Sequence, residues 1–473
     1  MDPIAQQHLN LLKSKSSFYK IRPINRVLLF IFIISILCLS LLFPYSVGIP
    51  VFCIGFINYI YLLIFRIQNN TSITPDIGTQ ITELPDSVKP SFSIIIPLKN
   101  EDEVIHRTLD AIQALEYPDA LKQIIIVVES TDHVTLSILS KIDLDDNMEV
   151  LLIPEAAPYT KGRALLHGIK AAKGDILTVY DAESRPEPEQ LGKAAAILAN
   201  EGPGLCLQAK IHISNKSSNW ITRNFAGEYY EWYERHLKTL SHEGFSFGLG
   251  GNSFFIRREE LIKSGSWDPF NVTEDADLAV RLIENGVRIR LFDSVTTESC
   301  PEKWTDWSNQ RTRWNKGLFI TQLVHIPGSI ENGKFSFSQW VNFWLPMIGS
   351  AMVPFYNFFI PLFMLSAGLS YYTLLGMSFS LWSLLGINLL SSTLLNRLTY
   401  QRINIKSSFL STLRDVMAYL LIHLLAGFKA YAEYFISPLH WHKTKHTENE
   451  KSFSAEILTE TKSEIQQSFK VTL

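Results

Sequence analysis

The sequence predicts an α/β domain with a doubly wound, mostly parallel sheet, flanked by transmembrane α-helices. Three short apolar runs rich in β-branched residues, at 91–97, 123–129 and 175–181, are typical of buried parallel strands. Helical patterns lie between them, at 100–115 and 162–172, as expected for strands joined by crossover helices. Long apolar stretches are concentrated towards the two ends of the 473-residue chain, which predicts a soluble middle with membrane flanks.

The N-terminal part of the chain contains two apolar runs, at 27–43 and 47–65, each close to the ~20 residues that cross a bilayer. A signal peptide is the competing interpretation of the first run. However, the Pro-Tyr-Ser sequence that follows is not a small-residue cleavage site, and the second run comes immediately. We therefore expect a transmembrane hairpin at 27–66. The segment 1–26 carries five basic residues, so the positive-inside rule places it, and the domain after the hairpin, in the cytosol.

The C-terminal part, at 340–440, is expected to form further membrane helices. The stretches 340–367 and 371–395 are long enough to span, and three prolines should kink the first. Charged residues interrupt 409–435 and both of its flanks are basic, which favours an interfacial or re-entrant segment over a single crossing. The polar tail at 447–473 is expected to be disordered. These features predict a multi-pass protein of an inner or plasma membrane.

Charge and cysteine content exclude two classes of function. The net charge is only −3 and no basic run is interleaved with aromatic residues, so nucleic acid is not an expected partner. The four cysteines include no CxxC pair, which argues against a zinc or redox site and is typical of unpaired thiols in a reducing compartment.

Acidic residues stand at the ends of two predicted strands. Glu129 ends the second strand, and Asp181 ends the third and is followed by Ala182 and Glu183. Two carboxylates one residue apart beyond a strand end can share a hard divalent cation, Mg²⁺ or Mn²⁺, and leave its other positions to diphosphate oxygens and water. Considered alone, an acid-x-acid triplet can equally be a solvated turn.

Several segments in a fixed order give the chain a family resemblance. They are Ile94–Glu101, Lys161–Leu165, Tyr180–Leu191, Gly248–Arg258, Thr273–Leu282 and Gln310–Trp314. Over Ser91–Phe319 the chain resembles the family 2 processive membrane glycosyltransferases, which include cellulose synthase and hyaluronan synthase. The last three segments are similar to that family's acceptor-side glycine loop, TED motif and QxxRW motif. The resemblance implies a GT-A fold at 90–335, a nucleotide-sugar donor and a divalent cation.

The resemblance also implies roles for the residues on the donor side. Glu129 would accept hydrogen bonds from the nucleoside, and Lys161 and Asp181 would bind the rest of the donor, with Asp181 and Glu183 as the metal ligands. Glu129 stands where many relatives carry paired aspartates, and Glu183 stands where aspartate is commoner, so the geometry of the base and metal contacts is open. Lys161 alone could be a solvated lysine at the start of a helix.

On the acceptor side, Asp275 is the expected general base, with Glu274 beside it. Acids at this position could instead only match the dipole of a helix N-terminus. At helical spacing Gln310, Arg313 and Trp314 share one face, where Trp314 would offer the acceptor a flat ring and Arg313 would meet phosphate charge. Further tryptophans are expected at the lipid headgroups, namely Trp304, Trp307 and Trp340.

Three functions are compatible with these features. The first is an inverting, processive enzyme that transfers a sugar, by resemblance from UDP-glucose, to a growing polysaccharide. The second is a single-transfer enzyme that acts on a lipid-linked acceptor. The third is a catalytically inactive membrane scaffold, against which the intact acidic and QxxRW residues argue. The expected partners are a nucleotide-sugar donor, a glycan or lipid-linked acceptor and membrane lipid, and export or regulatory subunits are left open.

Overall fold

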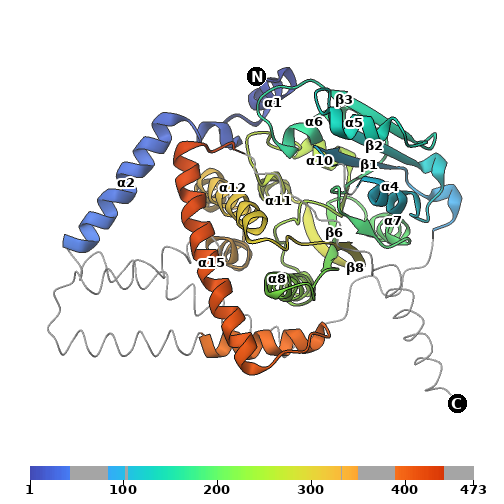
Figure 1. Cartoon of the computed structure of the whole chain (residues 1–473). Coiled ribbons are helices and arrows are strands. Elements are labelled where there is room, and N and C mark those ends of the chain that lie inside the picture. Colours follow the sequence, from blue (N-terminus) through green and yellow to red (C-terminus); the bar gives the residue numbers. More distant parts are fainter. Residues whose placement is uncertain (43–83, 102–104, 332, 350–388, 441–473) are drawn as a thin grey trace, which may run out of the picture.

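The computed structural model describes five stretches of the chain, residues 1–42, 84–101, 105–331, 333–349 and 389–440. An eight-stranded mixed sheet lies at the centre, with the strand order β3-β2-β1-β4-β7-β6-β8-β5. Helices pack on both of its faces, and a group of longer helices stands beside it (Figure 1). The fold is therefore α/β, as the sequence predicts.

One half of the sheet is parallel and contains the three predicted strands together with a fourth. Parallel pairing joins β1 to β2, β1 to β4 and β2 to β3. Since parallel strands point the same way, their carboxyl ends meet at one edge, where doubly wound folds bind their ligands. These strands are β1 (Phe92–Leu98), β2 (Lys122–Glu129), β3 (Met148–Ile153) and β4 (Ile176–Val179).

The other half of the sheet is mixed, so the sheet is mostly parallel, as predicted, but contains two strands that run against the others, β7 and β5. β7 runs antiparallel to both β4 and β6, and β5 runs antiparallel to β8, whereas β6 and β8 are parallel. The loop 248–252 reaches β7 from the edge where β4 ends, so β7 must enter the sheet in the opposite direction. These strands are β5 (Arg185–Pro186), β6 (Leu205–Ile213), β7 (Phe254–Arg257) and β8 (Arg288–Glu298).

Helices on the two faces of the sheet bury two apolar clusters. α4 (Ile105–Gln113) and α7 (Gln190–Glu201) pack on one face, and α6 (Lys161–Ala171) and α11 (Glu274–Glu284) pack on the other. Alternate residues of β1 belong to alternate clusters, as the period of a strand requires. Short helices and 3₁₀ turns complete the domain: α5 (His133–Leu139), α10 (Arg258–Lys263), η4 (Asp86–Val88) and η5 (Asp119–Leu121).

Longer helices stand beside the sheet and enclose its carboxyl edge. α8 (Trp220–Tyr230) continues through a π-helical turn, η6 (Glu231–Leu237), into α9 (Lys238–His242). α12 (Trp304–Glu331) lies along α15 (Phe409–Ile436), and α15 also contacts α8 (Figure 1). The α/β domain and α15 are thus in direct contact.

The N-terminal segment, predicted as a cytosolic stretch at 1–26, packs on the α/β domain. α1 (Pro3–Leu12) contacts α6, and two 3₁₀ turns, η1 (Lys13–Lys15) and η2 (Ser17–Tyr19), follow it. α2 (Pro23–Leu42) then leads away from the domain with many large apolar side chains exposed (Figure 1). This helix contains the beginning of the predicted hairpin, and the second apolar run, 47–65, lies outside the described residues.

The stretch 409–435, expected to be an interfacial or re-entrant segment, forms one uninterrupted helix of 28 residues, α15, which has no re-entrant break; its interfacial placement stays a prediction. Within the described part of the chain, it is the one helix that is long and apolar enough to cross a bilayer. Its charged residues pair with the α/β domain: Asp415 with Arg223 at 2.7 Å and Glu433 with Lys316 at 2.9 Å. The predicted spans 340–367 and 371–395 lie largely outside the described residues.

Candidate active site

A cavity of about 790 Å³ opens at the carboxyl edge of the parallel strands, between the sheet, α8, α12 and α15. Residues from widely separated parts of the chain line it together. All of the site residues predicted from the sequence are among them: Glu129, Lys161, Asp181, Glu183, Glu274, Asp275, Gln310, Arg313 and Trp314.

Glu129, at the end of β2, is held by two cations. Its carboxylate pairs with the guanidinium of Arg163 and lies 3.0 Å from the ammonium of Lys99. Arg163 is only 1% exposed and also donates to the Pro154 carbonyl at 2.7 Å and to the Asp2 carboxylate at 3.2 Å. An N-terminal residue therefore reaches the predicted donor side of the cavity through one buried arginine.

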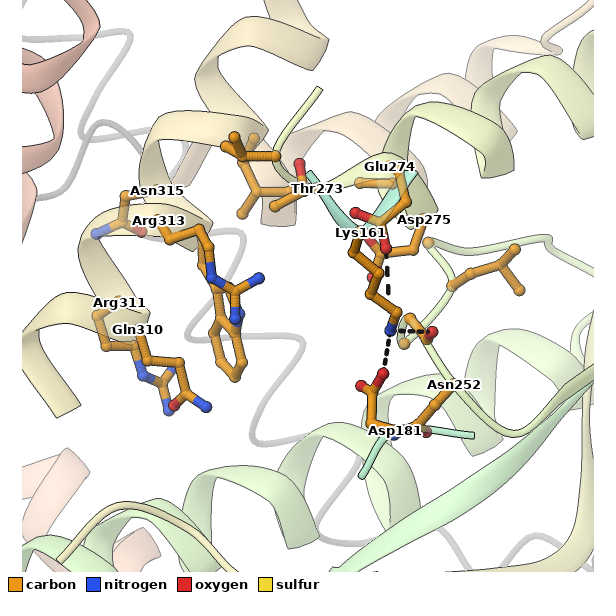
Figure 2. Close-up of a pocket in the computed structure, with 18 of the residues that line it drawn as sticks. Lys161, Asp181, Asn252, Thr273, Glu274, Asp275, Gln310, Arg311, Arg313 and Asn315 are labelled. Carbon is orange, nitrogen blue, oxygen red and sulfur yellow. Dashed lines mark hydrogen bonds and ion pairs between the residues drawn. The ribbon is translucent and has the colours of Figure 1, made fainter. Parts of the chain in front are cut away.

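Lys161 begins α6 and lies in the middle of a group of acids. Its ammonium pairs with the carboxylate of Asp181, donates to the Gly251 carbonyl at 2.9 Å and lies 3.9 Å from Glu274 Oε1 (Figure 2). Burial opposes its charge, but the neighbouring carboxylates, Asp181 foremost, outweigh burial and raise the pKa of Lys161. Lys161 therefore stays protonated and is not the solvated lysine that the sequence left possible.

A third carboxylate, which the sequence analysis missed, joins the acid-x-acid triplet. Glu298 ends β8 and accepts a hydrogen bond from the Ser184 hydroxyl at 2.9 Å and another from the Asn252 amide. Burial, followed by the charges of Glu183 and Asp181, raises the pKa of Glu298 to about 8. The strand-end rule that found the other acids would have found Glu298, had its strand been recognised.

The residues present fit a divalent cation whose coordination the substrate completes. Asp181 and Glu183 offer hard oxygen ligands. Burial, followed by the charge of Asp181, raises the pKa of Glu183 to about 7, and a bound cation would relieve this repulsion. Among the described residues, no three His, Cys, Asp or Glu side chains are arranged to hold a metal ion on their own. The other coordination positions would therefore fall to diphosphate oxygens and water.

Glu274 and Asp275 lie in the first turn of α11, close to Lys161 (Figure 2). Burial raises the pKa of both carboxyl groups, that of Glu274 to about 7. Gly251 has a φ of +83°, and a Cβ built there would lie 2.9 Å from Asp275 Oδ2. Only glycine suits this position, because any other side chain would strain the backbone and press on Asp275.

Asp277, the third acid of this turn, makes structural contacts inside the protein. It is fully buried, pairs with Arg281 at 2.6 Å and accepts from His325 of α12 at 2.7 Å. Asp277 therefore ties α11 to α12 inside the protein. Glu274 and Asp275 line the cavity and also accept backbone hydrogen bonds at the start of α11, so the site interpretation and the helix-dipole interpretation both fit their position.

The QxxRW residues of α12 form the opposite wall. Arg313 extends from α12 into the space facing Lys161 and Asp181 (Figure 2). Arg311, between the motif residues, makes two hydrogen bonds to the Glu228 carboxylate, at 2.7 and 2.8 Å. Its guanidinium lies 4.6 Å from the ring centroids of both Trp314 and Phe225. This cation–π packing fixes the orientation of Trp314 at the cavity wall.

The structure corrects the placement of Trp307 at the lipid headgroups. Trp307 is fully buried, packs on Tyr419 of α15 with ring centroids 5.3 Å apart, and donates to the Tyr419 hydroxyl at 3.2 Å. It joins α12 to α15 inside the protein. Trp304 stacks on Trp307 and stays partly exposed, while Trp340 donates to Ser329 at 3.1 Å. The interfacial placement of these last two remains a prediction.

Comparison with known sequences identifies relatives of the middle of the chain. A family model described as "Glycosyltransferase like family 2" matches residues 90–317. The probable glycosyltransferase YdaM of Bacillus subtilis is 31% identical over 234 residues, which are 48% of this chain and 55% of that protein. Beta-monoglucosyldiacylglycerol synthase of Trichormus variabilis is 26% identical over 256 residues, 53% of this chain and 54% of that protein. The chain thus spans about half the length of the curated relatives it matches.

Comparison with solved structures supports the same fold. A mannosyltransferase from Pyrobaculum calidifontis, solved with GDP-mannose and Mn²⁺, superposes with a TM-score of 0.55 at 15% sequence identity. The match covers 82% of this chain and 97% of that chain. The likeness shows a mixed α/β, GT-A-like fold with a predominantly parallel sheet.

Proposed function

We propose, on the premise that residues 90–317 form a glycosyltransferase family 2-like domain, that this chain is a membrane-embedded, inverting glycosyltransferase. It transfers a sugar from a nucleotide-diphosphate sugar, UDP-glucose as first candidate, to a growing polysaccharide. One observation carries the proposal. The strand-end acids, Lys161, the TED acids and the QxxRW residues all line the same cavity.

On the donor side, charge is distributed to suit a nucleoside diphosphate. The Glu129 carboxylate, already oriented by Arg163 and Lys99, accepts hydrogen bonds from the base. Lys161 and Arg313, on opposite walls, supply positive charge to the diphosphate. A divalent cation bound by Asp181 and Glu183 would neutralise charge that develops on the leaving diphosphate.

On the acceptor side, Asp275 acts as the general base. Its carboxylate removes the proton of an acceptor hydroxyl while that oxygen forms a bond to the anomeric carbon of the donor sugar. The bond from the anomeric carbon to the diphosphate breaks on the opposite side, so the configuration inverts and the nucleoside diphosphate leaves. Burial raises the pKa of Asp275, which makes it a stronger base than an exposed carboxylate.

Trp314 provides a flat apolar ring for the terminal sugar of the acceptor, with Gln310 and Glu274 nearby on the cavity wall. The membrane part consists of α2, α15 and the spans predicted outside the described residues. With the catalytic domain in the cytosol, a processive enzyme would deliver its product directly into this membrane part. Separate subunits for export or regulation remain open.

A lipid acceptor with single transfer is the second candidate, and a specific observation favours it. Apolar side chains line part of the cavity, among them Leu420 and Leu424 of α15 together with Phe343 and Met347. Some relatives are named as synthases of a glucosyl-diacylglycerol. An acyl chain could occupy this part while its headgroup met Trp314.

Product analysis tests the proposal. Purified protein in lipid nanodiscs is incubated separately with labelled UDP-glucose, UDP-N-acetylglucosamine and GDP-mannose, with Mg²⁺ or Mn²⁺, and nucleotide release is measured together with product size and extraction into organic solvent. We expect one donor to give nucleotide release and a water-soluble polymer. A glycolipid of one sugar would favour the second candidate. No release above that of an Asp275→Asn variant, with any donor, would refute both.

A further inference from the structure

The π-helical turn η6 presents aromatic side chains to the cavity at a place that no family motif covers. π-Helical turns are rare and are found frequently at functional sites. Four residues of this turn line the cavity, the carboxylate Glu231 and three with rings, Trp232, Tyr233 and His236. We therefore expect this turn to contribute to ligand binding in the cavity.

Two rings of the turn form one flat unit. The indole of Trp232 stacks on the imidazole of His236, with centroids 4.6 Å apart and planes 18° from parallel. His236 is buried, whereas 37% of Trp232 remains exposed. Burial lowers the pKa of His236 to about 3, so the ring pair is uncharged at neutral pH. The result is a rigid, neutral aromatic surface at the cavity wall.

The surroundings of this surface are polar, as a carbohydrate requires. Glu231, the first residue of the turn, lines the cavity and accepts a hydrogen bond from the Thr399 hydroxyl. Thr399 lies in the helical segment 389–402, whose Ser392 and Asn396 also line the cavity. The wall of the cavity thus has an aromatic ring together with a carboxylate, an amide and a hydroxyl, which suits the apolar face and the hydroxyl rim of a pyranose. An acyl chain would gain nothing from these polar groups.

The turn is connected to the catalytic centre by other rings. Tyr229 lies between Trp314 and Tyr233, with centroid distances of 6.4 and 5.7 Å. The Tyr233 hydroxyl approaches Gly250, the neighbour of the glycine that contacts Asp275. An aromatic row thus runs from Trp314 along α8 into η6, on the acceptor side of the cavity.

We propose that the Trp232–His236 pair is a second carbohydrate platform, which holds a sugar unit of the growing chain beyond the terminal unit at Trp314. The inference rests on the proposed function and deepens it, because it assigns a glycan of at least two units as the acceptor. In a processive enzyme, mean product length is the ratio of the transfer rate to the release rate. A platform that slows release therefore lengthens the product.

The test compares Trp232→Ala with Trp304→Ala. Both tryptophans are 37% exposed and both stack on an aromatic neighbour, but Trp304 does not line the cavity. We expect Trp232→Ala to shorten the polymer roughly tenfold, as a loss of about 50 Å² of apolar contact predicts, and Trp304→Ala to leave the length unchanged. Trp232→Phe should give intermediate lengths. If Trp232→Ala does not fold, Trp232→Leu keeps apolar bulk without a ring and carries the test.

Product length is measured by gel filtration of labelled polymer at low conversion. Unchanged length in Trp232→Ala, or equal shortening in Trp304→Ala, would overturn the platform while leaving the glycosyltransferase proposal intact. A wild-type product of one sugar on a lipid would also overturn it. The proposed function itself would fail separately, if the wild type released no nucleotide from any donor.

Discussion

Asp2→Asn is expected to disturb the donor side of the cavity from the N-terminal helix. Asp2 Oδ1 accepts from the backbone N–H groups of Ile4 and Ala5, at 2.8 and 3.1 Å, and asparagine can keep both bonds, since the two residues cap helices equally well. Oδ2 accepts from Arg163 at 3.2 Å and from His167 at 2.9 Å. An amide NH₂ group at that place cannot accept from either. Asp2→Asn therefore removes the contacts with Arg163 and His167 while it keeps the N-cap of α1.

The expected loss of stability is about 2 kcal/mol. Breaking a buried ion pair typically lowers the free energy of unfolding by ~3–5 kcal/mol. Because Arg163 would still be bonded to Glu129 and to the Pro154 carbonyl, we expect about half of that loss. For a domain of this size, the thermal midpoint should fall by about 4–8 °C. Burial opposes the charge of Asp2, but the bonds from His167, the Ala5 N–H and Arg163 together outweigh burial and lower the pKa of Asp2. The contribution of the ionised Asp2 carboxylate to the free energy of unfolding is therefore present at neutral pH. It is lost only as the pH falls through the lowered pKa of Asp2.

The functional consequence is measured as donor affinity. Once Asp2 no longer holds Arg163, the guanidinium shifts towards Glu129, and we expect donor binding to weaken roughly tenfold, or ~1.4 kcal/mol. A double-mutant cycle with Glu129→Gln, read by calorimetric titration of the donor, should give a coupling energy of about 1 kcal/mol. Gln7→Ala is the control, because Gln7 also joins α1 to α6 but through an exposed contact with Lys170. Additive effects, or an equal loss in the control, would refute the reasoning.

Further expectations concern the chemistry and the topology. Asp275→Asn should lower transfer by ~10²–10⁴-fold in single-turnover assays while donor affinity is kept; poor donor binding or near-normal transfer would direct the search for the base to Glu274. Asp181→Ala should reduce turnover by orders of magnitude and abolish its response to added Mg²⁺ or Mn²⁺, and full wild-type activity in EDTA would contradict the metal assignment. Trp314→Ala should raise the acceptor KM and leave donor affinity unchanged; the first is checked by acceptor titration of the transfer rate and the second by binding of isotope-labelled donor. Cysteines introduced at 403–406, after the helical segment 389–402, should resist an impermeant maleimide added outside intact cells, and labelling there would overturn the cytosolic placement.

Local patterns in the sequence were sufficient to predict much of the site. Glu129 and Asp181 could be found because a buried strand is a short, continuous apolar run, and the residue after it must lie at the sheet edge. The TED and QxxRW residues were found by family resemblance, and the structure brings them to the same cavity. Glu298 was missed because β8 has alternating burial, without the continuous apolar run of the central strands.

Contacts between distant segments could not be predicted from the sequence. Arg163 pairs with Asp2, 161 positions earlier, and no periodicity links two such residues. The same limit applies to the charged residues of α15. Its charged residues read as interruptions of an apolar run, yet Arg223 and Lys316 supply partners from elsewhere in the chain. Trp307 was misplaced for the same reason, since its partner Tyr419 lies on α15.

The position of α15 has a consequence for how the protein responds to its surroundings. The helix long enough to cross a bilayer also forms part of the cavity wall, through Val416, Tyr419 and Leu420. Ion pairs fasten it to α8 and α12, so tilt of this helix must be transmitted to the wall. Helices tilt to match hydrocarbon thickness. In the proposed membrane-embedded enzyme, bilayer thickness would thereby become a physical input to catalysis, and the lipid composition of the host membrane would influence the rate without any dedicated regulator.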